Sequence, residues 1–231
     1  MKTLVITGTS RGLGKALALH YLSAGWQVLG CSRYESDWFH PHYHHVICDL
    51  TSEKEVVSWF RGMKKLGFRP DAVVHNAGAA AMNHTLLTSI DSFRRLWEVN
   101  TLSAFLVGRE AAKFWVREKV SGKLIFISTV AVPLALEGEA AYVAAKAGLE
   151  GLAMSWANEF KPLNIAVNII GPGPVDTALW RSVPHDARAK LLERLQEPRL
   201  TSPEEIASAC DELLLASTWR SGERIYFNLK P

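Results

Sequence analysis

The sequence predicts a doubly wound α/β fold, in which helices cover both faces of a seven-stranded, mostly parallel sheet. Short continuous apolar runs alternate with helix-like stretches from one end of the chain to the other. Apolar runs that are continuous rather than alternating are typical of strands buried on both faces. The regular alternation of the two kinds of segment indicates the same fold class.

Seven apolar runs are the predicted strands. They are Thr3–Thr7, Gln27–Cys31, His45–Cys48, Ala72–His75, Lys123–Ile127, Ile165–Ile169 and Arg224–Phe227. A first helix is predicted over Lys15–Gly25 and an amphipathic one within Pro184–Gln196. A further helix begins at Pro203, with Thr201 or Ser202 as its N-cap. Folds of this class bind ligands beyond the carboxyl ends of the strands, so we expect the site there.

Length and composition predict a single domain over residues 1–231, because a chain of 231 residues is long enough for one buried core and short for two. The chain is 48% hydrophobic and 21% charged, which is ordinary soluble-protein composition. A net charge of +3 without a basic run predicts neither a nucleic-acid partner nor a membrane partner. We expect a cytoplasmic protein without a signal peptide, whose partner is a small molecule.

Cysteine and histidine usage argues against disulfides and metals. The three cysteines are set in apolar surroundings, which predicts reduced thiols. Four histidines crowd the segment His40–His45, but no carboxylate or cysteine stands at ligand spacing beside them. We therefore predict a titrating surface loop there and no metal site.

Three glycines follow the first predicted strand at the spacing Gly-x-x-x-Gly-x-Gly. Such glycines permit a tight turn and let a pyrophosphate approach the backbone at the start of a helix. The loop therefore predicts a dinucleotide site. Its residues are Gly8, Thr9, Ser10, Arg11, Gly12, Leu13 and Gly14.

The end of the second predicted strand bears on which dinucleotide binds. NAD sites usually place an acidic residue there for the ribose 2′-hydroxyl, whereas this chain has Ser32 and Arg33. A guanidinium suits a 2′-phosphate, and Arg11 supplies a second positive charge. We therefore predict a preference for NADP(H), with NAD(H) as the alternative. The competing interpretation of Arg33 is an ordinary solvated arginine.

Tyr142 and Lys146 lie four residues apart in an alanine-rich run of high helix propensity. This spacing puts the phenol and the ammonium group on one helical face. A neighbouring cation favours the phenolate, which makes the tyrosine a usable proton carrier. Ser128, fourteen residues upstream, has a hydroxyl that could hold a carbonyl oxygen within reach of the phenol. The three residues suit a carbonyl reductase or an alcohol dehydrogenase; the competing interpretation is a half-buried structural tyrosine.

Taken together, these motifs and several others in the same order resemble the short-chain dehydrogenase/reductase family, in its compact branch. The resemblance spans nearly the whole chain. Besides the glycine loop, Ser128, Tyr142 and Lys146, it rests on Asp49-Leu50, His75–Gly78, Asn100 and the segment 167–177. It implies a Rossmann-type fold and a homodimer or homotetramer.

The resemblance also implies a role for each matched residue. Tyr142 is the acid/base, Lys146 lowers its pKa and holds the nicotinamide ribose, and Ser128 orients the carbonyl. Asn100 anchors a water that links Lys146 to solvent. The implied cofactor contacts are Asp49 and Leu50 at the adenine, Asn76, Ala77 and Gly78 at the adenosine ribose, and Pro172, Gly173, Val175 and Thr177 at the nicotinamide carboxamide, beside Tyr142 and Lys146.

The substrate pocket is predicted around a lid insertion at about residues 178–199, which begins near Trp180. Apolar residues 134–136 form the predicted opposite wall, so we expect an apolar or acyl-chain ketone rather than a sugar. The leading hypothesis is an NADPH-dependent ketone reductase, possibly of a 3-oxoacyl thioester. Two alternatives stay open: an alcohol dehydrogenase working oxidatively, and a non-catalytic regulatory protein that binds the cofactor.

Overall fold

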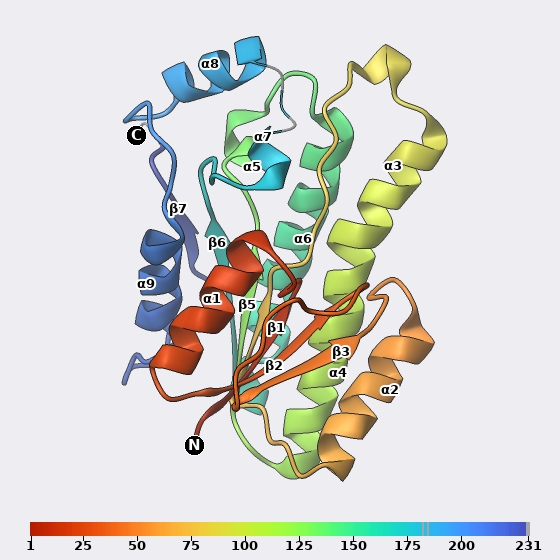
Figure 1. The fold of residues 1–231 in the computed structure, drawn as a ribbon, viewed down its shortest axis with the longest axis vertical. Helices are drawn as coiled ribbons and strands as arrows, with labels where there is room; N and C mark the ends of the chain where they lie inside the picture. The colour runs from red at the N-terminus through yellow and green to blue at the C-terminus, as the bar shows by residue number, and fades with distance from the viewer. Residues whose placement is uncertain (182, 184, 230–231) are drawn as a thin grey trace.

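The structure, a computed structural model, describes residues 1–181, 183 and 185–229. Within them, seven strands form one sheet in the order β3-β2-β1-β4-β5-β6-β7 (Figure 1). The strands are β1 (Thr3–Thr7), β2 (Gln27–Ser32), β3 (Tyr43–Ile47), β4 (Ala72–His75), β5 (Gly122–Ile127), β6 (Ile165–Gly171) and β7 (Arg224–Tyr226). Each neighbouring pair is parallel, which confirms the predicted doubly wound α/β fold.

The central strands are buried along their whole length, as their continuous apolar runs predict. Every residue of β1, β4 and β6 is buried. The edge strand β3 begins at Tyr43 rather than at the predicted His45, because Tyr43 pairs with Val28 of β2 and packs its ring into the core. On the same strand Val46 and Ile47 remain exposed.

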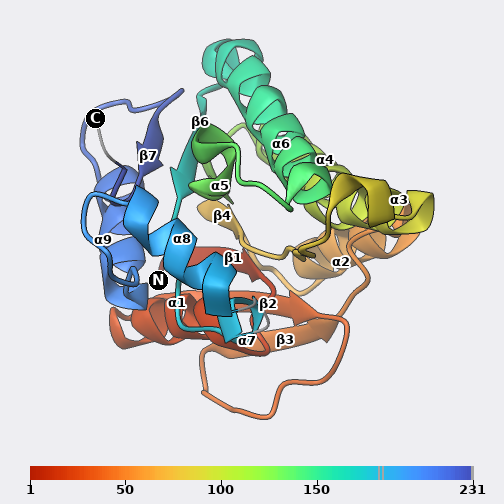
Figure 2. The ribbon, with the colours of Figure 1, turned by 90° about the horizontal axis from the view of Figure 1, so that it is seen from above.

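Helices cover both faces of the sheet (Figure 2). On one face lie α1 (Gly12–Ser23) and α9 (Pro203–Leu214), and on the other lie α2 (Glu53–Lys65), α4 (Ser103–Glu118) and α6 (Ala140–Glu159). Each face has its own apolar core, one around Tyr21 and the other around Trp115. The sheet separates the two cores.

Several shorter elements complete the described part of the chain. They are η1 (Thr85–Leu87), α3 (Ile90–Trp97), the π-helix η2 (Glu98–Leu102), α5 (Ala131–Leu134), η3 (Lys161–Leu163), α7 (Ala178–Arg181) and α8 (His185–Arg194). Figure 1 shows α5, α7 and α8 gathered at one end of the molecule. Among the described residues, no helix combines the length and apolar character that crossing a membrane requires.

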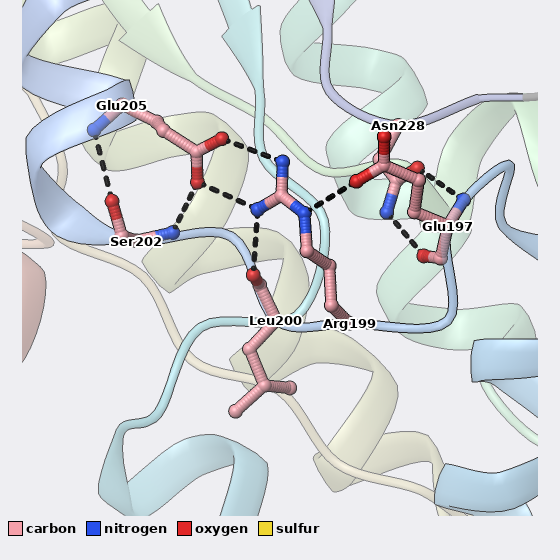
Figure 3. A network of polar contacts seen from close by, with 6 residues as sticks. All are labelled: Glu197, Arg199, Leu200, Ser202, Glu205 and Asn228. Carbon is pink, nitrogen blue, oxygen red and sulfur yellow. Dashed lines mark hydrogen bonds and ion pairs between the residues drawn. The ribbon is translucent and has the colours of Figure 1, made fainter.

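A polar network fixes the chain between α8 and α9 (Figure 3). The Arg199 guanidinium donates to Glu205 at 2.8 and 3.0 Å and to Glu197 at 2.6 Å. Ser202 and Glu205 form a capping box at the start of α9, which identifies Ser202 as the N-cap. The Glu197 backbone N–H donates to the side chain of Asn228 (2.6 Å), so the segment is also joined to the C-terminal tail.

Candidate active site

One cavity of about 1600 Å³ lies beyond the carboxyl ends of the strands. Both the glycine loop and the Tyr142–Lys146 pair line it. Of the predicted site residues, Thr9 alone does not line the cavity: its side chain is fully buried and bonds to the Tyr43 hydroxyl at 2.7 Å. The structure therefore brings the other predicted site residues together at this end of the sheet.

The glycine loop turns directly into α1. That helix begins at Gly12 rather than at the predicted Lys15, and the residues of its first turn, Gly12 to Gly14, line the cavity. Gly12 has a φ of +58°, and a side chain on Gly14 would meet the Gly8 carbonyl oxygen at 2.1 Å. No acidic residue stands in the first turn of α1. The positive helix end and the closely approaching backbone fit a diphosphate.

Two arginines border the cavity near the end of β2. Arg11 precedes α1 and Arg33 follows β2, and both are exposed. Within the described part of the chain neither forms an ion pair, whereas the nearby Lys15 pairs with Asp37 at 3.4 Å. The Arg33 guanidinium lies 5.9 Å from the Tyr34 ring centroid. Both arginines are thus available to an anionic ligand.

Residues that follow β3 and β4 line the part of the cavity between these arginines and Tyr142. The Asp49 carboxylate accepts from the backbone and the hydroxyl of Thr51, at 2.9 and 2.8 Å. The Asn76 amide donates to the Thr7 carbonyl at 3.1 Å. A side chain on Gly78 would meet Asn100 Oδ1 at 2.8 Å. These contacts fix the positions of the residues that line this part of the cavity.

Tyr142 and Lys146 both lie in α6, as predicted, and both are buried. Burial raises the pKa of the Tyr142 phenol, the charge of Glu139 raises it further, and a hydrogen bond with the Thr129 side chain lowers it. Burial lowers the pKa of Lys146 to about 8, and the charge of Glu150 opposes that shift. The buried ammonium group therefore loses its proton at a lower pH than an exposed lysine does.

Asn100 lies in the π-helix that joins α3 to α4. Its amide nitrogen donates to the carbonyls of Ala79 and Leu96 at 2.8 and 2.9 Å, and its side-chain oxygen accepts from the Ala79 N–H. Local π-helices recur at functional sites because they redirect a side chain out of the regular helical register. Here Asn100 of the π-helix connects the loop after β4 to α3, because its side chain bonds to Ala79 in that loop and to Leu96 in α3.

Ser128 and Thr129 follow β5 and direct their hydroxyls to different places. The Ser128 hydroxyl donates to the buried carboxylate of Glu150 at 2.5 Å. Thr129 is the residue whose side chain lies close enough to Tyr142 to lower the pKa of its phenol. The sequence analysis named Ser128 and did not consider Thr129, although the two hydroxyls are adjacent in the sequence and both residues line the cavity. The sequence feature that distinguishes the two hydroxyls is Glu150. Its buried carboxylate requires a hydrogen-bond donor, and Ser128 is the donor that reaches it.

The substrate side of the cavity carries more charge than the sequence predicts. Of the predicted apolar wall, Leu136 lines the cavity, and so does Trp180 of α7. Glu137 and Glu139 line it as well. Burial raises the pKa of Glu139, and within the described residues its carboxylate has no hydrogen-bond partner. Three basic side chains also line the cavity: Arg95, Lys190 and Arg194.

Comparison with known proteins gives consistent similarities. The sequence model of the short chain dehydrogenase family matches residues 2–188. The chain is 29% identical over 236 residues to the 3-oxoacyl-[acyl-carrier-protein] reductase FabG of Salmonella typhimurium, covering 98% of this chain and 96% of that protein. It is 28% identical over 206 residues to the reductase MabA of Mycobacterium tuberculosis, covering 89% and 82%.

Solved structures are similar along the whole chain. A 4-hydroxyisoleucine dehydrogenase complexed with NADH superposes with a TM-score of 0.88 at 25% identity, covering 98% of this chain and 96% of that one. The aldohexose dehydrogenase of Thermoplasma acidophilum gives a TM-score of 0.85 at 24% identity, with coverages of 98% and 92%, and so shows the fold alone.

Proposed function

Because the chain belongs to the short-chain dehydrogenase family and is an oxidoreductase of that family, we propose that it is an NADPH-dependent reductase of a ketone. The observation that carries the proposal is the shared cavity, in which a diphosphate-binding glycine loop and a buried tyrosine–lysine pair face the same space. A hydride donor and a proton donor can therefore meet on one substrate.

In this proposal Tyr142 donates a proton to the carbonyl oxygen of the substrate. The Thr129 hydroxyl, which lies near Tyr142 and lowers the pKa of its phenol, holds that oxygen in place. Lys146 stabilises the phenolate that remains and donates to the Ile127 carbonyl at 2.8 Å, which fixes its position. Asn100 shapes the wall beside Lys146, where a water can return the proton. The bound nicotinamide cofactor supplies the hydride.

The NADP(H) preference in this proposal rests on charge at the end of β2. Arg11 and Arg33 border the cavity, and the strand ends in Ser32 instead of an acid. A 2′-phosphate carries enough negative charge to engage both guanidinium groups. NAD(H) is the alternative, which the NADH named with the 4-hydroxyisoleucine dehydrogenase supports.

For the substrate we propose a 3-oxoacyl thioester or a similar ketone of biosynthesis. Two related proteins are named 3-oxoacyl-[acyl-carrier-protein] reductases. Arg95, Lys190 and Arg194 line the cavity without ion pairs within the described residues, so they suit an anionic carrier arm. Leu136 and Trp180 suit its acyl part. We further propose a cytoplasmic homodimer or homotetramer.

An oxidative alcohol dehydrogenase is the second candidate, supported by the likeness to a 4-hydroxyisoleucine dehydrogenase. A non-catalytic regulatory protein is opposed by the retention of Asn100, Tyr142 and Lys146 in one cavity. The three candidates differ in which reaction, if any, proceeds with purified protein.

The test is oxidation of NADPH at 340 nm with acetoacetyl-coenzyme A, compared with NADH and with the Tyr142→Phe variant. We expect turnover with NADPH and a loss of at least about 100-fold in Tyr142→Phe, since the acid is removed. Turnover only in the direction of alcohol oxidation would favour the second candidate. Equal rates in the wild type and Tyr142→Phe would refute the proposed acid.

A further inference from the structure

Glu150 is a carboxylate buried in the interior behind the active site. It lies on α6, one helical turn beyond Lys146, and 4% of its surface is exposed. Buried carboxylates are rare unless hydrogen-bonded donors satisfy them. Both oxygens of Glu150 are satisfied by hydroxyls: Ser128 donates to one and Tyr226 to the other, each at 2.5 Å.

These two donors come from different strands. Ser128 follows β5, and Tyr226 is the last residue of β7. The Tyr226 ring also packs on Gly171 at the end of β6, so closely that a Cβ on that glycine would lie 2.3 Å from the ring. Since Pro172 and Gly173 then line the cavity, the carboxylate of Glu150 ties α6 to the strand ends that carry the site.

Glu150 is also the negative charge that acts on the catalytic lysine. The Lys146 ammonium is buried and donates to the Ile127 carbonyl rather than to Glu150, so the two charges interact through space. Other groups facing Lys146 are the phenol of Tyr142 on α6, the amide of Asn100 on the π-helix and the neutral ring of His75 on β4. Within the described residues, Glu150 is the one charge that favours the ammonium.

We propose that Glu150 is a positioning residue of the reaction: it keeps the buried Lys146 cationic and, through Ser128 and Tyr226, holds the ends of β5 and β7 against the catalytic helix. The inference rests on the proposed function, in which the Lys146 charge stabilises the Tyr142 phenolate. In this proposal Ser128 supports the site by donating to Glu150, and Thr129 is the residue that holds the carbonyl oxygen of the substrate.

The electrostatic part is tested by NMR of protein labelled with 13C at lysine Cε, with Lys146→Arg used to assign the signal. In the wild type we expect the Lys146 signal to titrate near pH 8. In Glu150→Gln the midpoint falls by about one pH unit, because the favourable charge is lost while the hydroxyls keep an acceptor. This measurement needs no turnover, so it stands whether or not the proposed reaction is found.

Tyr226→Phe is the matched control, since it removes a hydrogen bond and keeps the carboxylate. We expect the titration midpoint of Lys146 in Tyr226→Phe to equal that of the wild type. The temperature of half-unfolding of this variant should be lower. If Glu150→Gln does not fold, Glu150→Met provides a second neutral side chain of similar size. A Lys146 midpoint unchanged in a folded neutral variant would overturn the proposal.

The pH dependence of kcat gives a second test, because replacing a purely structural residue would not change it. With a midpoint shifted from 8 to 7, the cationic fraction of Lys146 at pH 7.5 falls about threefold. We therefore expect kcat of Glu150→Gln to fall about threefold at pH 7.5 and to recover at pH 6, with KM little changed. A loss of kcat that is equal at both pH values contradicts the proposed charge effect. Absence of turnover in the wild type would instead count against the proposed function.

Discussion

Nδ1 of His75 lies 3.2 Å from the hydroxyl of Thr7 on the neighbouring strand. Nε2 of the same ring lies 3.2 Å from the Ser103 hydroxyl at the start of α4, so the histidine joins β1, β4 and α4. The ring is fully buried, and burial lowers its pKa to about 3, with the charge of Lys146 as a second cause. His75 is therefore neutral in the folded protein at physiological pH.

This buried histidine should make the protein sensitive to acid. Because the pKa is lower in the folded than in the unfolded state, the unfolded chain binds a proton that the folded one does not, and stability present above pH 6.5 is lost as pH falls towards 3. We expect this group alone to remove about 1.6 kcal/mol between pH 6.5 and pH 5. Urea unfolding at both pH values measures it. His75→Gln cannot titrate, so its stability should decline less; equal declines would contradict the assignment.

Thr129 and Ser128 should differ in their importance for turnover. We expect Thr129→Val to lower kcat by about 100-fold or more, because it removes the hydroxyl that faces Tyr142 and the carbonyl oxygen. Thr129→Ser keeps that hydroxyl and should retain most activity. Ser128→Ala should cost less activity and about 1–3 kcal/mol of stability, because Glu150 loses a buried donor. A larger loss of kcat in Ser128→Ala than in Thr129→Val would return the role to Ser128.

Glu139 should control the pH at which Tyr142 works. Its charge raises the pKa of the phenol, so Glu139→Gln lowers that pKa. Alcohol oxidation requires the phenolate, and its rate should therefore reach half-maximum at a lower pH in this variant, by roughly half a unit to one unit. The neighbouring Glu137→Gln, which also removes a carboxylate from the cavity lining, serves as the control and should leave the profile nearly unmoved. Identical shifts in both variants would point to a general charge effect.

Arg33 should select the cofactor. We expect Arg33→Asp to weaken NADPH binding by about 10- to 100-fold, since a charge-assisted bond to the 2′-phosphate is replaced by repulsion. NADH lacks that phosphate and should bind with little change. The exposed Arg61 of α2 lies outside the cavity lining, so Arg61→Asp controls for the change in net charge. Equal or tighter binding of NADH by the wild type, measured by fluorescence titration, would reject the NADP(H) preference.

Much of the fold follows from local patterns in the sequence. β1 and β4 begin and end at the predicted residues, because continuous apolar runs bounded by polar segments mark buried strands clearly. For α9 the sequence left Thr201 and Ser202 as alternative N-caps, and the structure selects Ser202 through its capping box with Glu205. The start of β3 at Tyr43 was missed, because that residue is buried by the aromatic ring of Trp38, 3.9 Å away, rather than by a local pattern.

The site was predictable where spacing along one element decides it, as for Tyr142 and Lys146 on α6. It was not predictable where tertiary partners decide it. Ser128 and Thr129 both follow β5 and both carry a hydroxyl, and the direction of the Ser128 hydroxyl is set by Glu150, which is 22 residues away. Thr9 belongs to the glycine loop in sequence, but its hydroxyl bonds to Tyr43 across the sheet edge and leaves the cavity. Such choices emerge only when distant segments meet.

The parallel direction of all seven strands has a practical consequence for altering this protein. Their carboxyl ends converge on one rim, where the cavity lies, and in the described part of the chain the opposite rim carries connections between helices and strands. Gly25 and Gly67 lie in such connections; each has a φ of +79°, so these two positions are best kept as glycine. Tags, labels or surface attachment introduced along that opposite rim should therefore leave catalysis undisturbed.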